Sequence, residues 1–511
     1  MKKILLAVNA EYGQANVFLA VGHALQALDP SVQIHFVSFA AISNDVSAAS
    51  AYSVQCTPGA QPWTFHLLDG PSFMQAIRDK DAVHDIEGAI QKRPGFFSTI
   101  EVLSKMMHLL MPWDGPEFVQ IYKSFVRVVD EVQPDIIAVD SLFAVATTAC
   151  RHLKLNHLIL SPNTLKDFAA SLQPRGAMLW KFPVMGSAFE FPVPLRSIPA
   201  NVFFVFCQIY YVLTDTKLKG VAAYVKRELG AQLTTFQDLM MAPIPGQKVL
   251  VANRPEIEYP LVVPPHLTAC GPVMRPVPAV ADIDPELAAW LRHGPTVFIS
   301  LGTHRFMLED EALEMAGAIQ QLFDAAEARK EGAGGGVGGV PGKLQVLWKL
   351  KRDRPGDVPT YETGPGTKVY KVLEEAMEEG RVRIVDWVKP QPTAILQTGT
   401  VVCSVSHGGA NSFNDALTCG IPQLVIPGWV DCYDFAGRAE FLGIGRWANK
   451  QAMPKCTARE VGPILIDVVL GPKAQAMRTR VQELAALCEK TPGASVAAAA
   501  ILEVIEDSKT K

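Results

Sequence analysis

The stretch "TVVCSVSHGGANSFNDALTCGIPQLVIPG", residues 400 to 428, contains a strand, a glycine turn, a helix and a second strand in that order. The apolar run "TVVCSVS" at 400–406 ends at the sequence His407-Gly408-Gly409. A helix is expected to follow and to lead into the apolar run "PQLVIPG" at 422–428. Strands that are apolar on both faces and alternate with helices are typical of a parallel sheet covered by helices.

Similar apolar runs occur on both sides of this stretch. They are "KILLAVN", "VQIHFVSF", "DIIAVDS" and "HLILSPN" in the first part of the chain, and "TVFISLG", "LQVLWKL" and "RIVDWV" in the second. Two such series predict an α/β protein with two Rossmann-like domains. The predicted organisation is an N-terminal domain at 1–271, a proline-rich linker at 272–284, a C-terminal domain at 285–470, and a final segment at 471–511. That segment is expected to hold one helix, about 474 to 506, and to pack back toward the N-terminal domain.

Composition excludes several classes of protein. The 511 residues exceed one ordinary core, and 49% apolar with 19% charged residues is the balance of a packed protein. A formal net charge of −4 leaves no excess of positive charge that would favour binding to nucleic acid. The nine cysteines, scattered and odd in number, argue against a disulfide framework or a zinc site and indicate a reducing compartment.

Three segments could be mistaken for a signal peptide, a membrane span or a phosphate loop. The start, "MKKILLAVN", has an apolar core too short for a signal peptide and is interpreted as the first buried strand. The run "VFFVFCQIYYVL" at 202–213 is shorter than the ~20 residues of a bilayer span, so a buried helix or a pocket wall is expected, with membrane-surface contact as the alternative. The glycine-rich segment at 331–343 lacks the phosphate-loop pattern and is expected to be an insertion.

The turn that follows residues 400–406 has the chemistry of an anion site. Its glycines let backbone amides approach an anion, and the helix N-terminus favours negative charge. His407, Asn411 and Ser412 add side-chain donors, as a diphosphate requires, and Asp415 can accept from sugar hydroxyls. Trp387, at the end of an earlier strand, can stack on a nucleobase. Each residue alone is as easily a turn or core residue, but together they map to the carboxyl ends of strands, where α/β sheets bind ligands.

This pattern resembles the nucleotide-sugar signature of family 1 glycosyltransferases, the UDP-glycosyltransferases of GT-B fold, whose two Rossmann-like domains face each other across a cleft. The matching positions are Trp387, Gln391, His407, Gly409, Asn411, Ser412, Asp415, Gly420, Pro422, Pro427 and Asp431. The wording "HGGANSF.DAL" and "PGWVDCYDFA" is similar to the fungal branch that acts on small molecules. The segments "SLGTH" at 300–304 and "GQANVFLAVGHAL" at 13–25 extend the resemblance more weakly.

The resemblance implies a role for each matching residue. Trp387 would stack on uracil beside the backbone of Val388, and Gln391 and Asp415 would hold the ribose. The diphosphate would be bound around Gly409 by Thr303, His407, Asn411 and Ser412. Asp431 would contact sugar hydroxyls, and Asp431 with Cys432 forms the pair that reads the donor sugar. The family inverts the anomeric centre in one displacement, without a metal and with the UDP-sugar as co-substrate rather than a bound cofactor.

Three departures from the family pattern concern the donor. Trp387 and Gln391 are one residue further apart than in the plant pattern, which affects the ribose contact of Gln391. Asp415 stands where glutamate is usual and has a shorter reach. Cys432 stands where glutamine is common, so the identity of the donor sugar is left open.

A fourth departure concerns the catalytic base. The family has a Gly-His pair in the N-terminal turn, but Gln14 occupies the histidine position here and cannot act as a base. The family's partner aspartate is matched by Asp140. Asp140 could take the proton itself, through water held by Gln14; Glu11 in the same turn could take it; or the acceptor could be acidic enough to need little help. Asp140 is preferred because its strand end is expected to face the cleft, while His23 and His66 are weaker candidates.

The sequence therefore predicts an inverting, metal-independent UDP-glycosyltransferase, a hexosyltransferase of secondary metabolism, that moves a sugar from a UDP-sugar to a small apolar acceptor. A polyketide, terpenoid, sterol or phenol is expected from the resemblance and from the runs "FFVFCQIYY" and "LSKMMHLLMPW". The alternatives are a catalytically weak nucleotide-sugar-binding protein or partner subunit, and a nucleotide-sugar epimerase. A cytoplasmic protein with no nucleic-acid partner and no membrane span is expected, and no oligomeric state is predicted.

Overall fold

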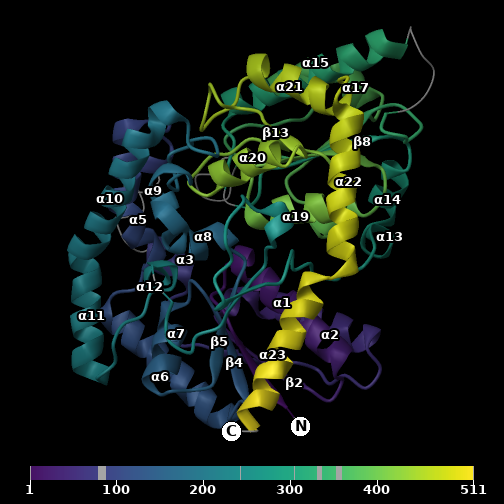
Figure 1. Ribbon diagram of the computed structural model, residues 1–511. Coiled ribbons are helices and arrows are strands. Elements are labelled where there is room, and N and C mark those ends of the chain that lie inside the picture. The colour runs from purple at the N-terminus through teal and green to yellow at the C-terminus, as the bar shows by residue number, and fades with distance from the viewer. Residues whose placement is uncertain are drawn as a thin grey trace.

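The computed structural model describes residues 2–78, 88–241, 243–303, 305–330, 337–352 and 359–509. These residues form two parallel β-sheets covered by helices, one in each half of the molecule in Figure 1. The predicted class, α/β with two Rossmann-like domains, is confirmed. Part of the glycine-rich insertion, residues 331–336, lies outside the described residues.

The N-terminal sheet is parallel, with strand order β3-β2-β1-β4-β5-β6-β7. Its strands are β1 (Lys3–Ala7), β2 (Gln33–Ser38), β3 (Thr64–Leu67), β4 (Ile136–Asp140), β5 (His157–Ser161), β6 (Val249–Val251) and β7 (Leu267–Ala269). The central strands are uninterrupted apolar runs because helices cover both of their faces. Strand β1 is central, since Leu6 pairs with Phe36 of β2 on one side and with Ala138 of β4 on the other.

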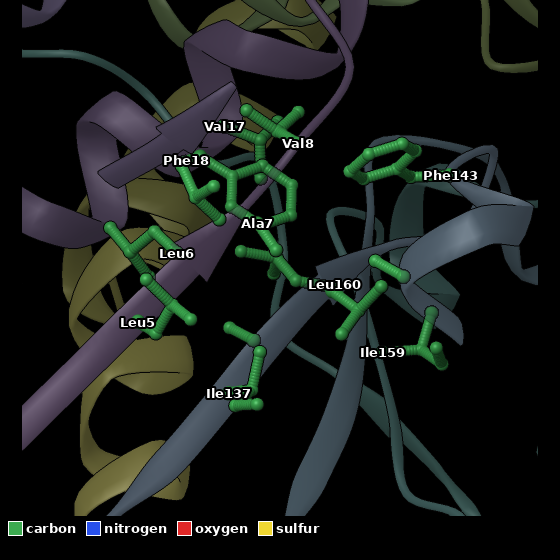
Figure 2. Packing of buried hydrophobic residues seen from close by; sticks show 14 of the residues in the cluster. Leu5, Leu6, Ala7, Val8, Val17, Phe18, Ile137, Phe143, Ile159 and Leu160 are labelled. Carbon is green, nitrogen blue, oxygen red and sulfur yellow. The ribbon is translucent and has the colours of Figure 1, made fainter. Parts of the chain in front are cut away.

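Helices of the N-terminal half connect these strands and cover the sheet. They are α1 (Tyr12–Leu28), α2 (Ser43–Cys56), α3 (Phe73–Arg78), α5 (Phe96–Leu110), α6 (Gly115–Val132), α7 (Ala144–His152), α8 (Leu165–Ala169), α9 (Ala177–Trp180), α10 (Ile198–Thr214), α11 (Thr216–Leu229) and α12 (Phe236–Met241), with short 3-10 turns at Ala40–Ile42, Ala170–Leu172, Pro174–Gly176, Leu195–Ser197 and Pro255–Ile257. Figure 2 shows the core, where Phe18 of α1 and Phe143 lie over side chains of β1, β4 and β5. This core fixes the position of the carboxyl ends of the strands, which face the C-terminal half.

The C-terminal sheet is also parallel, with strand order β10-β9-β8-β11-β12-β13. Its strands are β8 (Thr296–Ser300), β9 (Gln345–Lys349), β10 (Val382–Val385), β11 (Val401–Ser406), β12 (Gln423–Val425) and β13 (Gly445–Trp447). Its helices are α14 (Pro285–Leu291), α15 (Glu309–Lys330), α16 (Lys368–Val372), α17 (Glu374–Glu378), α18 (Pro392–Leu396), α19 (Ala410–Thr418), α20 (Cys432–Phe441) and α21 (Ala458–Val469). The opening stretch of the sequence analysis is therefore β11, α19 and β12, at the middle of this sheet.

The chain passes between the two halves twice. It leaves the N-terminal sheet after β7 and enters the second half through α13 (Val280–Ile283) and α14. The expected single helix at 474–506 is wrong, because the chain forms α22 (Ala474–Lys490) and α23 (Gly493–Lys509) with Pro492 between them. Proline disfavours helical backbone at the residue before it, and Thr491 leaves the helix with φ −136°. Helix α22 packs on α19, whereas α23 packs on α1 in the other half, and the two form the yellow column of Figure 1.

Helix α10 differs from its expectation. Within the described residues, the stretch Leu195–Thr214 is long and apolar enough, by length and composition, to cross a membrane. Only 17% of its apolar 18-residue segment is buried inside the protein. The expectation that 202–213 forms a buried helix or a pocket wall is met only in part. Phe204 and Val205 are buried, whereas Phe203, Phe206, Tyr210 and Leu213 are exposed.

Candidate functional site

A cleft of about 1320 Å³ lies between the carboxyl ends of the two sheets. The N-terminal half contributes the segments that follow β1, β4 and β5, and the C-terminal half contributes those that follow β8, β10 and β11. In open α/β sheets, ligands bind at this edge because the loops that follow the strands meet there.

The N-terminus of α19 is open to the cleft because two glycines precede it. A side chain at Gly408, whose φ is +83°, would place its Cβ 2.7 Å from Val425 Cγ1. A Cβ at Gly409 would lie 2.6 Å from His407 Nε2. The turn therefore excludes larger residues, and Gly409, Asn411 and Ser412 line the cleft beside the free amides of the helix. This arrangement favours an anionic ligand.

His407 joins the turns that follow β8 and β11. Its ring packs against Trp429 with a centroid distance of 5.3 Å, and a Cβ at Gly302 would lie 2.6 Å from His407 Cε1. Thr303, the next residue, lines the cleft, and its carbonyl accepts a hydrogen bond from Lys351 Nζ. Donors from two strand ends therefore face the same part of the cleft.

Trp387 presents its indole to the cleft and is 58% exposed. The Nζ of Lys349, at the end of β9, lies 4.5 Å from the centroid of that ring. Burial and the neighbouring charge of Lys351 lower the pKa of Lys349 to about 8. Sequence reasoning missed Lys349, although a lysine inside the apolar run "LQVLWKL" was the available signal.

The predicted ribose contacts lie beside Trp387. The side chain of Val388 is buried in an apolar cluster, so its backbone is the part available to a ligand. Gln391 precedes α18 and lines the cleft together with Asp415. Burial raises the pKa of Asp415 to about 7, while a hydrogen bond with Thr393 opposes that rise.

Asp431 and Cys432 do not share the cleft surface. Asp431 lines the cleft, and burial raises its pKa to about 6, with the charges of Asp167 and Asp434 adding to the effect. Cys432 is fully buried, its Sγ lies 3.9 Å from Asp431 Oδ1, and it is absent from the described lining. The expectation that Cys432 contacts the donor is therefore not met, because the first turn of α20 directs its thiol into the protein.

A charged cluster that the sequence did not reveal connects the two halves beside Asp431. Lys166 Nζ of α8 lies 3.0 Å from Asp434 Oδ1 of α20, and both residues line the cleft. Arg438 donates to Asp434 at 2.9 Å and to Glu258, in the segment after β6, at 2.7 Å. Burial opposes ionisation of Asp434, but Lys166 and Arg438 outweigh it and lower its pKa. Sequence spacing gave no signal, since the partners come from distant segments.

The predicted catalytic residues separate into two layers. Glu11 and Gln14 line the cleft, and Gln14 Oε1 is buried with no hydrogen-bond partner within the described ranges. Asp140 is fully buried, where its Oδ1 accepts from the Leu142 amide at 3.0 Å and its Oδ2 from the Asn9 amide at 3.4 Å. Burial raises the pKa of Asp140 to about 7. The expectation that Asp140 faces the cleft is wrong, because the turn after β1 covers it.

The two weaker histidine candidates lie away from the described lining of the cleft. His23 stacks on Tyr52 at 6.0 Å, and burial lowers its pKa. His66 lies on β3, where its Nε2 is 3.0 Å from His35 Nδ1.

The N-terminal side of the cleft is largely apolar. The lining side chains include Met74, Ile77, Leu103, Met106, Leu109, Phe236 and Met240. Several come from the run "LSKMMHLLMPW", whereas only Gln208 of the run 202–213 reaches the cleft. The wall suits an apolar ligand.

Cationic groups gather on the other side. Besides Lys349, the side chains of Arg305, Lys389 and Lys455 line the cleft there, whereas Arg275 lies near Asp45 and Tyr12 of the N-terminal half. Arg305 is fixed by Glu311 and by the carbonyl of Ile426, to which it donates at 2.7 Å. The described parts of the chain contain no group of three His, Cys, Asp or Glu residues that could hold a metal ion.

Known proteins that are similar to this chain include glycosyltransferases. No family model matches the chain. Glycosyltransferase sdnJ of Sordaria araneosa is 28% identical over 481 residues, which cover 91% of this chain and 87% of that protein. A UDP-glycosyltransferase of Talaromyces amestolkiae is 29% identical over 52% of this chain and 47% of its own length. The chain is therefore similar to known glycosyltransferases, UDP-glycosyltransferases among them. A solved structure of a UDP-glucosyltransferase from Polygonum tinctorium, 14% identical over 99% of both chains with a TM-score of 0.60, shows the same fold.

The fold brings most of the predicted donor residues to one cleft. They are Thr303, Trp387, Val388, Gln391, His407, Gly409, Asn411, Ser412, Asp415 and Asp431. Cys432 and Asp140 lie beneath the surface. The role of each residue stays a prediction.

Proposed function

We propose that this glycosyltransferase moves a sugar from a UDP-sugar to a small apolar acceptor, with inversion and without a metal ion. One observation carries the proposal: a single cleft joins the open N-terminus of α19 and the indole of Trp387 to an apolar wall in the other half. The first two features suit a nucleoside diphosphate, and the wall suits a polyketide, terpenoid, sterol or phenol.

The donor would lie on the C-terminal half. Uracil would stack on Trp387, the ribose would meet Gln391 and Asp415, and the diphosphate would meet the α19 turn and Thr303. Negative charge grows on the diphosphate as its bond to the sugar breaks, so fixed donors and nearby cations stabilise the transition state more than the ground state. Lys349 and the helix dipole supply positive charge there, which supports a mechanism that needs no metal.

The acceptor would react in one displacement. Its nucleophilic oxygen forms a bond to the anomeric carbon on the face opposite the diphosphate. The bond from that carbon to the phosphate oxygen breaks, and its electron pair leaves with UDP. The acceptor proton passes to a base in the cleft, and we assign this role to Glu11, because it lines the cleft beside Gln14 whereas Asp140 does not. Asp140 is then a positioning residue that holds the turn through the Asn9 amide.

A reducing compartment is supported by the cysteines. All nine are free thiols, six of them buried. We therefore propose a cytoplasmic enzyme.

Calorimetric titration with UDP, with ADP and the Trp387→Ala variant as controls, tests the donor site. Product analysis with several UDP-sugars and a panel of apolar acceptors then tests transfer, the anomeric configuration of the product tests inversion, and repetition with a chelator tests the metal. Specific UDP binding followed by transfer is expected. No UDP binding would overturn the assignment of residues 386–445 as the donor site.

One observation favours a second candidate. Gln14 stands where the resemblance implies the catalytic histidine, which is compatible with a nucleotide-sugar-binding protein that has lost turnover. UDP binding without transfer to any acceptor in the panel would favour it. Conversion of the UDP-sugar with no acceptor present would instead indicate an epimerase.

A further inference from the structure

The outward face of α10 carries a row of apolar side chains, Phe203, Phe206, Tyr210 and Leu213, which we call the α10 ridge. Their exposed fractions are 46%, 58%, 62% and 66%. The spacing of three and four residues places them on one side of the helix. Helices α10 and α11 form the outer edge of the N-terminal half, on the side opposite α2 and α23 (Figure 1).

The apolar surface continues onto the neighbouring segments. Phe96 of α5 stacks on Phe203 with a centroid distance of 5.3 Å, and Phe97 beside it is 82% exposed. Leu195, just before α10, is 86% exposed. Contiguous exposed apolar surface of this kind marks an interaction site, whereas scattered single residues do not.

Internal contacts hold α10 on the protein. Phe204 and Val205, on its inner face, are buried in a cluster with Leu103 of α5. Asn201 is fully buried, where its Nδ2 donates to the carbonyls of Leu179 and Phe182 at 3.0 Å and its Oδ1 accepts from an amide of the same segment. A helix tied to its domain in this way does not cross a bilayer, but its outer face can lie on one.

The charge near the ridge differs from that of the whole chain. Residues 195–229 contain five basic and two acidic side chains, although the chain carries a formal charge of −4. Arg196, Lys219 and Lys226 in this segment are exposed. Exposed Phe, Tyr and Leu on one face, together with flanking Lys and Arg, are the composition of helices that bind anionic lipid surfaces.

We propose that the α10 ridge and its basic flanks dock this enzyme peripherally on an anionic lipid surface. The wall built by α5 and α10 then faces lipid on one side and the cleft on the other, since Leu103, Met106 and Leu109 of α5 line the cleft. Apolar acceptors of the proposed function dissolve in lipid, so docking brings their reservoir to the acceptor side. Only this last step rests on the proposed function.

Vesicle flotation of the full chain tests the docking. The probes are vesicles of phosphatidylcholine alone and vesicles that also contain phosphatidylserine. We expect flotation with the anionic vesicles, and a loss of at least about tenfold in bound fraction for the ridge variant Phe206→Gln/Tyr210→Gln/Leu213→Gln. The matched control is Leu28→Gln/Leu67→Gln/Ile283→Gln, which replaces residues of 52%, 55% and 44% exposure outside the ridge and should bind as the unchanged enzyme does.

Charge is tested separately. Lys219→Glu/Lys226→Glu should reduce binding to anionic vesicles and leave binding to neutral vesicles unchanged. No flotation of the unchanged enzyme, or equal flotation of the ridge and control variants, would overturn the proposal. A ridge variant that only converts a dimer to a monomer would also overturn it, in favour of contact between two copies.

Failure of docking and failure of the proposed function are distinguishable. Transfer to a water-soluble phenol should be unchanged in the ridge variant, whereas transfer to an acceptor held in anionic vesicles should fall. Flotation that is lost in the ridge variant, combined with no transfer to any acceptor, would sustain the docking and overturn the proposed function.

Discussion

Arg438 of α20 donates a hydrogen bond to Glu258 of the N-terminal half at 2.7 Å, and neither side chain is exposed to solvent. Asp434 and Lys166 extend this pair to four charged groups that link the halves beside the cleft. Burying such charges is costly unless each has its partner, so the loss of one partner leaves the others uncompensated.

Arg438→Met is therefore expected to reduce the free energy of unfolding by about 3–5 kcal/mol, because the Glu258 charge stays buried without its cation. Urea denaturation, followed by two spectroscopic probes, measures the change. The double variant Arg438→Met/Glu258→Leu should recover part of the loss. A single variant as stable as the double variant would contradict this account.

Trp387→Ala should weaken UDP binding by ~1–3 kcal/mol, the value of a base stacked on an aromatic ring. Isothermal titration calorimetry gives the difference directly. Trp180→Ala is the matched control, since that indole is exposed outside the described lining of the cleft. Equal affinities for the two variants would remove Trp387 from the donor site.

Lys349 should make UDP binding depend on pH. Its pKa is lowered to about 8, so the ammonium is charged at neutral pH and loses its proton as the pH rises through that region. A bound diphosphate favours the charged form, so affinity for UDP should fall across this range. Lys349→Met should bind more weakly at neutral pH and lack this component. Parallel pH profiles for the two proteins would exclude the lysine from the site.

Glu11→Gln should lower kcat by on the order of 10²–10⁴ with the Kd for UDP unchanged, because the proton acceptor is lost and the donor site is intact. Asp140→Asn should have a smaller effect, since its carboxylate is buried beneath the turn. Steady-state kinetics for both variants with one acceptor decides the order. A larger loss of kcat in Asp140→Asn than in Glu11→Gln would identify Asp140 as the proton acceptor instead.

Asp140 also predicts a pH dependence of stability. The ordinary pKa of an aspartate, 3.8, applies to the unfolded chain, whereas burial raises the pKa of Asp140 to about 7 in the folded protein. The folded state therefore favours the protonated form. Folding should therefore lose stability as the pH rises from about 4 to about 7. Asp140→Asn stays neutral, so its thermal stability relative to the unchanged enzyme should improve over this range. Asp130→Asn, an exposed carboxylate on α6, serves as the control, and an identical trend in both variants would refute the assignment.

The elements that the sequence predicted are those with an uninterrupted apolar run. Strands such as β1, β4 and β11 are buried on both faces, so their composition alone distinguishes them. Among the three-residue strands, β12 lies in the predicted apolar run 422–428, whereas β6, β7 and β13 were not anticipated because so short a run has no periodicity. Local motifs likewise predicted the turn before α19.

Other parts of the site depend on contacts between distant segments. The pairing of Lys166 with Asp434 forms only when the two halves meet, so nothing in the spacing predicts it. The burial of Asp140 depends on the turn after β1, and that of Cys432 depends on the direction in which α20 begins. The exposure of α10 could not be read from its apolar composition, which a core helix shares.

The return of the chain through Pro492 limits how relatives of this enzyme can be recombined. Ala497, Ala498 and Ile501 of α23 are fully buried in the core that contains α1 and β1, although they follow the whole C-terminal half in the sequence. A hybrid that joins the first half of one enzyme to the second half of another would bring a foreign last helix against that core. A working hybrid therefore needs two exchange points, one in the linker and one near Thr491, so that α23 and α1 come from the same parent.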